Sequence, residues 1–246
     1  MQAVIVVPCY NEADRLDTAA FLRFDGGEYR ARFCFVDDGS TDGTGAVIGD
    51  LVAADPSRFM QVTLERNRGK AEAVRRGILE ACAANPEYVG FWDADLATPL
   101  SELPLFFDVL AEQPQIEMVY GARVRLLGRS ISRNPARHYF GRVGATLISR
   151  TLGLAVYDTQ CGAKLFRVND TIRKIFVTPF VSKWIFDVEI IARFIEQRGR
   201  DDAARAIYEL PLRIWRDVKG SKVKSTDFLR ALRELRKIDR AYRKRE

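Results

Sequence analysis

Short apolar runs, each followed by polar residues, constrain the fold of this 246-residue chain more than any other feature. In the first half they cover residues 3–8, 33–36, 60–64, 88–92 and 117–120, and stretches with helical spacing separate them. Strands that alternate with helices of about 10–15 residues are typical of a doubly wound sheet whose strands are mostly parallel. The sequence therefore predicts an α/β fold with helices on both faces of the sheet.

Polar motifs come directly after four of these predicted strands. They are Asn11-Glu12, Asp37-Asp38, Asn67-Arg68-Gly69-Lys70 and Asp93-Ala94-Asp95. The carboxyl ends of parallel strands meet at one edge of a sheet, and the ligands of open α/β sheets bind there. We therefore expect the four motifs to share one site, and their positions favour a nucleotide-type ligand.

The acidic pair Asp93 and Asp95 is the candidate metal site. Side chains two apart on an extended segment point the same way, so both carboxylates can meet one cation. Two oxygen ligands that leave positions open for water and phosphate suit Mg²⁺ or Mn²⁺. An ordinary acidic turn is the alternative interpretation, and the residues on either side of the pair (89–92 and 96–99) favour the metal site.

Asp38 and Lys70 are candidate ligand-binding residues. A carboxylate at the end of a strand can accept hydrogen bonds from a base or a ribose, as the acidic residue of dinucleotide-binding folds does. Lys70 opens a predicted helix, where free backbone N–H groups and the ammonium can meet a diphosphate. The spacing around Lys70 is not that of a P-loop. Thr41 and Asp42 have the residue types of a turn and a helix start.

Composition is typical of a folded chain with a hydrophobic core, since 47% of the residues are apolar. No apolar run approaches the roughly 20 residues that cross a bilayer, and Met1-Gln2-Ala3 lacks the basic region of a signal peptide. The four cysteines have no Cys-x-x-Cys spacing, which indicates neither a disulfide framework nor a zinc site. We therefore expect a reduced, cytoplasmic compartment.

Charge is unevenly distributed along the chain, whose formal net charge is +6. Residues 1–117 carry 10 Lys and Arg against 20 Asp and Glu, whereas residues 118–157 carry seven arginines and no acidic residue. Residues 213–246 carry 13 basic residues against five acidic ones. Charge segregated in this way indicates an anionic partner.

The second half is less regular, and no linker divides it from the first. We expect a loop over residues 121–137, helices over 138–152 and 184–196, and strands at 158–166 and 207–210. These elements indicate one domain over residues 1–224, with halves 1–117 and 118–224, followed by a basic amphipathic helix over 225–246. That helix either lies on an anionic membrane surface or packs on the sheet with its basic face outward.

The motifs together resemble those of family 2 glycosyltransferases, which have the GT-A fold. In the first half the resemblance rests on Val7-Pro8-Cys9-Tyr10-Asn11-Glu12, Asp37-Asp38-Gly39-Ser40-Thr41-Asp42, the motif at 67–70 with Ala73-Val74-Arg75-Arg76-Gly77, and Asp93-Ala94-Asp95. In the second half, residues 158–166, 186–189 and 220–222 resemble the polyprenyl (dolichyl)-phosphate mannose and glucose synthases. The resemblance covers nearly the whole chain in order.

The resemblance implies a nucleotide-sugar donor bound by the first half, with the metal of Asp93 and Asp95 on its diphosphate. The residues expected to bind the substrate are Pro8, Tyr10, Asn11, Glu12, Asp38 and Lys70, with Arg123 and Lys222 near the phosphates. Ala97 stands where mannose synthases of the family often carry Gln, which weakens an assignment to GDP-mannose. The absence of a Gln-x-x-Arg-Trp motif argues against a polymerising synthase.

The choice of acceptor decides which residues the chemistry needs. A phosphate monoester has a second pKa of about 6, so it is largely a ready nucleophile near pH 7 and needs no strong base. Arg133 and Arg137 are the candidates to receive its charge, and the alternative is that they are solvated loop arginines. A hydroxyl acceptor would need a carboxylate to take its proton. Asp187 is then the candidate base, unless it caps its helix or faces solvent.

These observations predict an inverting, metal-dependent transfer of a hexose from a nucleotide-sugar, of the UDP-glucose or GDP-mannose type, to a polyprenyl phosphate. The enzyme would be peripheral on the cytoplasmic face of a membrane. A glycosyltransferase with a saccharide or other hydroxyl acceptor is the alternative. A non-catalytic binder of nucleic acid or another polyanion fits less well, because the acidic first half would repel phosphates and no nucleic-acid motif is present.

Overall fold

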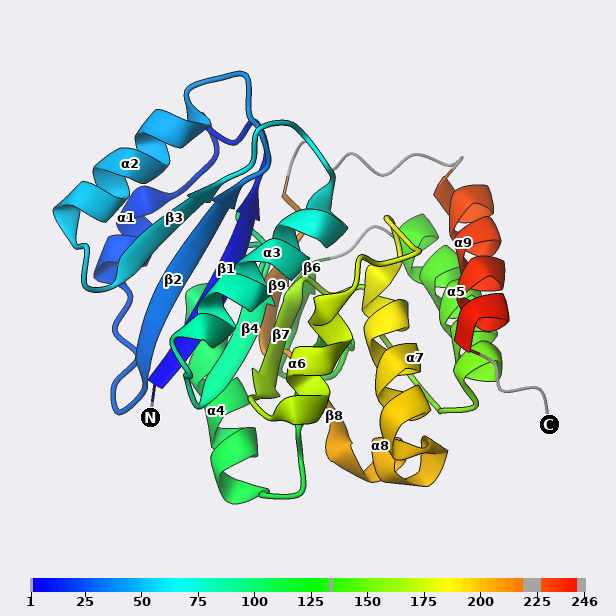
Figure 1. The fold of residues 1–246 in the computed structure, drawn as a ribbon. Helices are drawn as coiled ribbons and strands as arrows, with labels where there is room; N and C mark the ends of the chain where they lie inside the picture. The colour runs from blue at the N-terminus through cyan, green and yellow to red at the C-terminus, as the bar shows by residue number, and fades with distance from the viewer. Residues whose placement is uncertain (1, 133–134, 219–226, 243–246) are drawn as a thin grey trace.

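A seven-stranded sheet forms the centre of the molecule (Figure 1). The computed structural model describes residues 2–132, 135–218 and 227–242, except for the side chains of residues 135–141 and 227–229. The strands are β1 (Gln2–Cys9), β2 (Arg30–Asp37), β3 (Phe59–Thr63), β4 (Tyr88–Trp92), β5 (Met118–Ala122), β7 (Ala163–Arg167) and β8 (Ile207–Pro211). Their order across the sheet is β3-β2-β1-β4-β7-β5-β8. All five strands expected in the first half are confirmed.

Strand β7 is the one antiparallel member of this sheet. It pairs with β4 on one side and β5 on the other, and Ala163 at its start lies opposite Trp92 at the end of β4. The amino end of β7 therefore joins the carboxyl ends of the parallel strands at one edge. This topology brings residues 158–162 of the second half to the edge where the polar motifs of the first half lie.

Helices cover both faces of the sheet, because successive side chains of its strands point to opposite sides. Val4 and Val6 of β1 face the core under α3, α6 and α7, whereas Ile5 and Val7 face the core under α1, α2 and α4. The helices are α1 (Thr18–Arg23), α2 (Thr44–Ala54), α3 (Lys70–Ala83), α4 (Leu103–Glu112), α5 (Pro135–Leu152), α6 (Asp170–Val177), α7 (Phe186–Arg198), α8 (Arg200–Ala206) and α9 (Asp227–Tyr242). The doubly wound α/β architecture is confirmed.

Three local features differ from the sequence-based expectation. The strand expected over residues 158–166 begins only at Ala163. The stretch with helical spacing that follows Asn11-Glu12 is helical only from Thr18, because residues 11–13 are hydrogen-bonded to the β2–α2 connection instead. The expected loop over 121–137 contains a short strand, β6 (Ser130–Ser132), which pairs with β9 (Ile214–Arg216) in a second, two-stranded sheet. A three-residue strand has too few residues to show an alternating pattern.

Helix α9 packs against α5 and α7 rather than on the sheet (Figure 1). Leu235 and Ile238 are 8% and 1% exposed, and the Tyr242 hydroxyl donates to Glu189 of α7 at 2.7 Å. Fully burying one such aliphatic side chain stabilises a fold by about 1.5–3 kcal/mol. The outward face carries Arg230, Arg233, Arg236, Lys237 and Arg240. Within the described ranges, no helix is both long and apolar enough to cross a membrane.

Candidate active site

Asp93 lies at the carboxyl end of β4, against the backbone of the second half. Its amide donates to the Gly162 carbonyl at 2.9 Å. A Cβ placed on Gly162 would collide with the Asp93 carboxylate. Gly162 belongs to the Asp158–Phe166 motif, and its lack of a side chain provides the space in which that carboxylate lies. The spatial contact between the two motifs explains why both belong to one site.

Lys70 contacts Asp93 from the start of α3. Its ammonium forms an ion pair with Asp93 Oδ1, and the two side chains are 42% and 33% exposed. Burial alone would lower the pKa of Lys70, but Asp93 and Asp187 outweigh that effect and raise it. Lys70 is therefore a firmly charged cation beside the acidic pair, as expected for a group that meets a diphosphate.

Asp95 lies on a turn, so the expectation of an extended Asp93–Asp95 segment is wrong. Strand β4 ends at Trp92, and Leu96 has a φ of 49°, in the left-handed region. The Leu96 amide donates back to the Asp93 carbonyl at 3.2 Å, and the Ala97 amide donates to Asp95 Oδ1 at 3.1 Å. Burial and the neighbouring Asp93 raise the pKa of Asp95.

The chemistry of this pair fits a divalent cation. Both carboxylates are partly exposed, at 33% and 30%, and their mutual repulsion favours a positive charge between them. In the described part of the chain, no cluster of three or more His, Cys, Asp or Glu residues is arranged as a metal site. Two protein oxygens, with the remaining positions left to phosphate and water, are the donor set that suits Mg²⁺ or Mn²⁺.

The loop after β1 is hydrogen-bonded to the β2–α2 connection. The amide of Asn11 donates to Ser40 Oγ at 3.0 Å, and its side chain accepts from the Thr41 amide at 2.9 Å. The amide of Glu12 donates to Thr44 Oγ1 at 2.7 Å. Asn11 has a φ of 52°, a conformation that Asn tolerates better than most residues. Pro8, Tyr10, Asn11 and Glu12 are all partly exposed along this loop and remain predicted substrate-binding residues.

Asp38 binds the loop that carries Lys70. It is 2% exposed, and its two carboxylate oxygens accept from the amides of Arg68 and Gly69, both at 2.8 Å. Burial raises the pKa of Asp38 although these hydrogen bonds oppose the rise. The carboxylate therefore holds the start of α3 beside β2. Its expected contact with a base or ribose stays a prediction.

Arg123 is held by other residues of the second half of the chain. Its guanidinium forms a bidentate ion pair with Asp158, at 2.6 and 2.7 Å, and lies 5.3 Å from the centre of the Trp215 ring. Burial would lower the pKa of Arg123, and Asp158 more than offsets this. Glu209, in the middle of β8, fixes the same loop by accepting from the amides of Tyr157 and Asp158. Arg123 is therefore oriented before any ligand binds.

Asp187 forms a buried ion pair with Lys164, which the sequence analysis did not identify. The Lys164 ammonium is 2.6 Å from Asp187 Oδ1, and the side chains are 0% and 8% exposed. Lys164 also lies 4.9 Å from the centres of the Phe91 and Tyr120 rings. Asp187 neither faces solvent nor occupies the N-cap, which is Ile185, so both structural alternatives are wrong. Its role as a base stays a prediction.

Three predicted residues have no described side chain. Arg133 and Lys222 lie outside the described residues. Arg137 lies in the first turns of α5, but its side chain is also outside the described part. The structure brings together Asp93, Asp95 and Lys70 directly, and Arg15, which was not predicted, lies 3.8 Å from Asp95. An arginine on an irregular loop gave no periodic pattern by which to find it.

Comparison with known proteins assigns the class. The family model described as "Glycosyl transferase family 2" matches residues 4–173, and the chain belongs to this family.

Solved structures of other proteins have the same fold. Glucosyl-3-phosphoglycerate synthase from Mycobacterium tuberculosis matches with a TM-score of 0.63 and 18% identity, over 96% of this chain and 79% of that one. The mannosyltransferase PcManGT from Pyrobaculum calidifontis was solved with GDP-Man and Mn²⁺. It matches with a TM-score of 0.64 and 18% identity, over 99% of this chain and 65% of that one. The GT-A fold is thereby confirmed.

Similar sequences indicate which members of the family this chain resembles. The dolichyl-phosphate beta-glucosyltransferase of Dictyostelium discoideum is 31% identical over 236 residues, which are 89% of this chain and 68% of the relative. The proteins of the same name from Saccharomyces cerevisiae and Homo sapiens are each 31% identical, over 97% and 90% of this chain and 74% and 69% of their own lengths. The chain is thus a family 2 glycosyltransferase similar to dolichyl-phosphate glucose synthases.

Proposed function

We propose that this enzyme transfers a hexose from a nucleotide-sugar to a polyprenyl phosphate, with inversion and with the help of a divalent metal. The observation that carries the proposal is the cluster of Asp93, Asp95 and Lys70 at the carboxyl edge of the sheet. The names of the relatives support the lipid-phosphate acceptor and a glucosyl donor. Ala97, in place of the Gln of mannose synthases, also favours a donor of the UDP-glucose type.

Asp93 and Asp95 would hold the metal on the donor diphosphate. Mg²⁺ or Mn²⁺, when bound, supplies positive charge that stabilises the departing diphosphate. Two of the solved structures with this fold were obtained with Mn²⁺ and a nucleotide-sugar. Gly162 leaves the space that the Asp93 carboxylate occupies, so the second half of the chain determines the geometry of the metal ligand.

Lys70 and Arg123 would supply the remaining positive charge around the phosphates. Lys70 is the first residue of α3, and the start of a helix is where backbone amides can bind an anion. Arg123 is fixed by Asp158, so it loses little conformational entropy when an anion approaches. Lys222, Arg133 and Arg137 are proposed to complete this environment, the two arginines on the acceptor phosphate.

The acceptor chemistry follows from the pairing of Asp187. An acceptor phosphate is largely ionised near pH 7 and attacks the anomeric carbon without a strong base. A hydroxyl acceptor would need a carboxylate that takes up a proton. The buried ammonium of Lys164 already occupies Asp187 Oδ1 at 2.6 Å, so this oxygen has a partner within the protein and is not turned to an acceptor hydroxyl. This contact favours the phosphate acceptor over the saccharide alternative.

A panel of nucleotide-sugars, incubated with Mn²⁺ or Mg²⁺ and with or without a short polyprenyl phosphate, tests the proposal. We expect glucosyl transfer only when the lipid phosphate is present, and loss of transfer in excess chelator. Donor binding, followed separately by calorimetry, distinguishes an inactive preparation from the wrong acceptor. Transfer to a free saccharide in the absence of lipid phosphate, or full activity in chelator, would contradict it. The cytoplasmic face of a membrane is the proposed place of action.

A further inference from the structure

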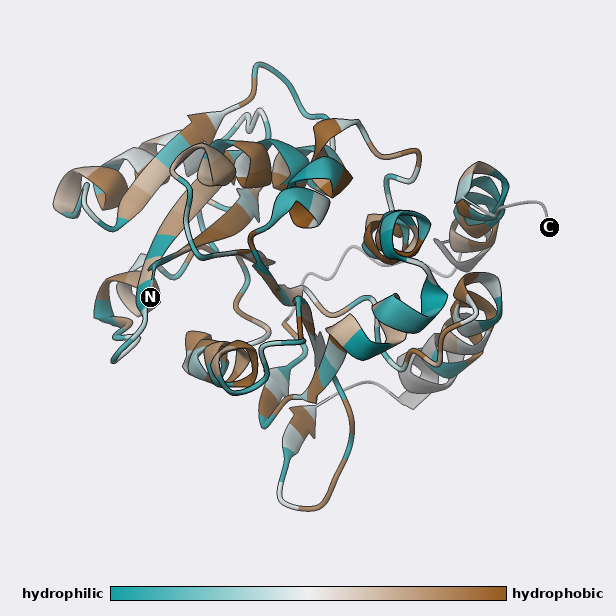
Figure 2. Cartoon of the chain, turned by 60° about the horizontal axis from the view of Figure 1, so that its bottom comes forward, coloured by the Kyte–Doolittle hydropathy of each residue, from teal (hydrophilic) through white to brown (hydrophobic). Residues whose placement is uncertain are grey.

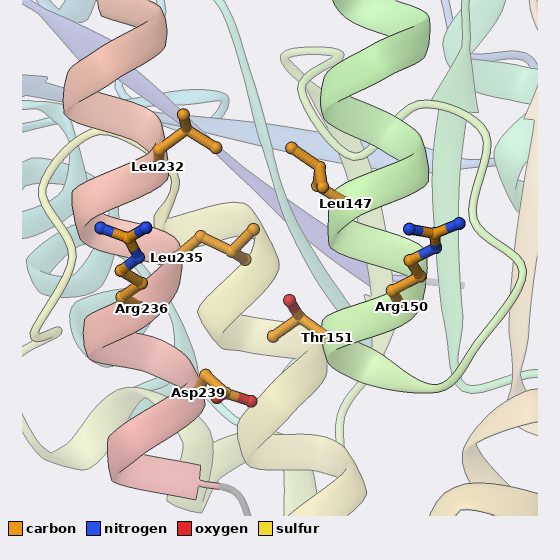
Figure 3. A pocket seen from close by; sticks show the side chains of 7 residues that line it. All are labelled: Leu147, Arg150, Thr151, Leu232, Leu235, Arg236 and Asp239. Carbon is orange, nitrogen blue, oxygen red and sulfur yellow. The ribbon is translucent and has the colours of Figure 1, made fainter.

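The apolar side of α9 is turned into the protein. Figure 3 shows Leu232 of α9 and Leu147 of α5 pointing toward one another across a groove between the two helices. This groove has a volume of about 340 Å³, and Leu235 lines it as well. Because these side chains face α5, the exposed side chains described for residues 230–242 are basic, with Ala241 as the exception. The part of α9 whose side chains are described therefore offers lipid little apolar contact.

The β5–β6 loop, residues 123–129, exposes two adjacent leucines. Leu126 is 51% exposed and Leu127 is 104% exposed. The Arg129 amide donates to the Leu126 carbonyl at 3.2 Å, and Gly128 has a φ of 78°, so the chain turns tightly around Leu127. Figure 2 shows this loop at the bottom of the view, projecting beyond the rest of the domain, with apolar residues at its tip.

The charged residues next to the two leucines in the sequence are of one sign. Arg125 and Arg129 flank them, and residues 118–157 contain no acidic residue. Exposed leucines alone are common at protein surfaces. Paired leucines between arginines combine apolar burial with electrostatic attraction, and both bind a protein to an anionic bilayer. The apolar side chains enter the interface and the guanidinium groups meet the headgroups.

The loop is anchored at the candidate active site. It begins at Arg123, which Asp158 holds in a bidentate pair. It ends at β6, whose Ile131 pairs with Trp215 of β9, the residue whose ring lies beside Arg123. A contact at the tip of the loop therefore places Arg123 a few residues from the lipid headgroups, which suits an acceptor phosphate at the bilayer surface.

We infer that the β5–β6 loop inserts Leu126 and Leu127 into the interface of an anionic membrane and thereby docks the enzyme beside its acceptor. The role of this docking rests on the proposed function, because an enzyme with a lipid acceptor needs its active site at the membrane surface. The docking itself concerns only the loop and the bilayer, so it is testable without any transfer reaction.

Vesicle binding of serine variants tests the docking. Vesicles of phosphatidylcholine and phosphatidylglycerol, without acceptor, are sedimented with the wild type, Leu127→Ser and Leu22→Ser. Leu22 lies on α1 and is 43% exposed, so its substitution is a matched control. We expect about tenfold weaker binding for Leu127→Ser, a larger loss for Leu126→Ser/Leu127→Ser, and no change for Leu22→Ser. Equal binding of all variants, or no binding by the wild type, would overturn the inference.

A fluorescent label locates the contact directly. All four native cysteines are buried, so Leu127→Cys supplies an accessible thiol for a polarity-sensitive dye. On addition of the same vesicles we expect brighter, blue-shifted emission from the label at position 127 and none from one at Leu22→Cys. Emission that stays unchanged at position 127 would refute insertion. If the label responds but no lipid phosphate is ever glycosylated, the proposed function fails while the docking stands.

Discussion

Two lysines contact aspartates near the candidate active site, and burial distinguishes the two pairs. Lys70 and Asp93 are 42% and 33% exposed, whereas Lys164 and Asp187 are 0% and 8% exposed. In the exposed pair, water and an arriving phosphate or cation can replace either partner at little cost. In the buried pair, each charge depends on the other, because both side chains are largely shielded from water. The first pair is therefore suited to exchange ligands and the second to fix the structure.

Substituting each lysine with methionine is the strongest test of this difference. Lys164→Met leaves the buried Asp187 without its ion-pair partner, and we expect it to lower the free energy of unfolding by about 3–5 kcal/mol. Lys70→Met removes a partly exposed ion pair, and we expect a loss below about 1 kcal/mol, together with weak transfer activity. Urea unfolding and a transfer assay measure the two effects.

A second variant shows whether the loss at Lys164 comes from the unpaired carboxylate. Lys164→Met/Asp187→Leu removes both charges, and we expect it to recover a large part of the lost stability. Equal destabilisation by Lys70→Met and Lys164→Met, or no recovery in the double variant, would remove the distinction between the pairs.

The contact between the two halves of the chain gives the next prediction. Gly162→Ala places a methyl group where the Asp93 carboxylate lies, so the carboxylate must move. A displacement of about 1 Å at a reacting centre costs up to about 100-fold in rate, and we expect a loss of about 10- to 100-fold in transfer. The rate at saturating donor and the Mn²⁺ concentration for half-maximal activity are the quantities to measure.

Gly144→Ala is the matched control for this change. A Cβ at Gly144, in the interior of α5, meets no other atom within 4 Å. We expect full activity and a gain in stability of up to about 1 kcal/mol from the better helix former. If Gly162→Ala keeps wild-type activity, the second half of the chain does not position the metal ligand.

The sequence predicts secondary structure best where the pattern lies within a few consecutive residues. Every expected strand of the first half is present, because an apolar run of four to six residues between polar motifs admits few other structures. Asp93, Asp95 and Lys70 were placed together because the carboxyl ends of parallel strands share one edge. The turn at Leu96 was missed, since a positive φ at a leucine has no sequence pattern.

Contacts between distant residues were beyond this kind of prediction. The pairs of Lys164 with Asp187 and of Arg123 with Asp158 join residues that lie 23 and 35 positions apart. Periodicity places residues on faces of a helix or strand, but it does not say which buried cation meets which carboxylate. The sequence does not determine the packing of α9 for the same reason, because an amphipathic face fits a membrane and a neighbouring helix equally well.

The smallest expected effect concerns the negative charge of Asp95, which lies beside the exposed pair of Lys70 and Asp93. Burial and Asp93 raise the pKa of Asp95 above its ordinary value of 3.8, so the folded protein binds its proton more tightly than the unfolded chain does. Asp95 therefore costs stability above its folded pKa, and this cost disappears as the pH falls through that pKa and then through 3.8. We expect Asp95→Asn to stabilise the metal-free protein at pH 7 by less than about 1 kcal/mol.

The same substitution should abolish metal-dependent transfer, because the amide loses a charged oxygen ligand. Unfolding in urea at pH 7 and near pH 3, in chelator, measures the stability of both proteins, and the advantage of Asp95→Asn should vanish at the lower pH. Asp50→Asn, at an exposed position on α2, is the control and should change neither property. A variant at Asp95 that is less stable at pH 7 would mean that the carboxylate is already compensated within the protein, and the exposed pair would then resemble the buried one.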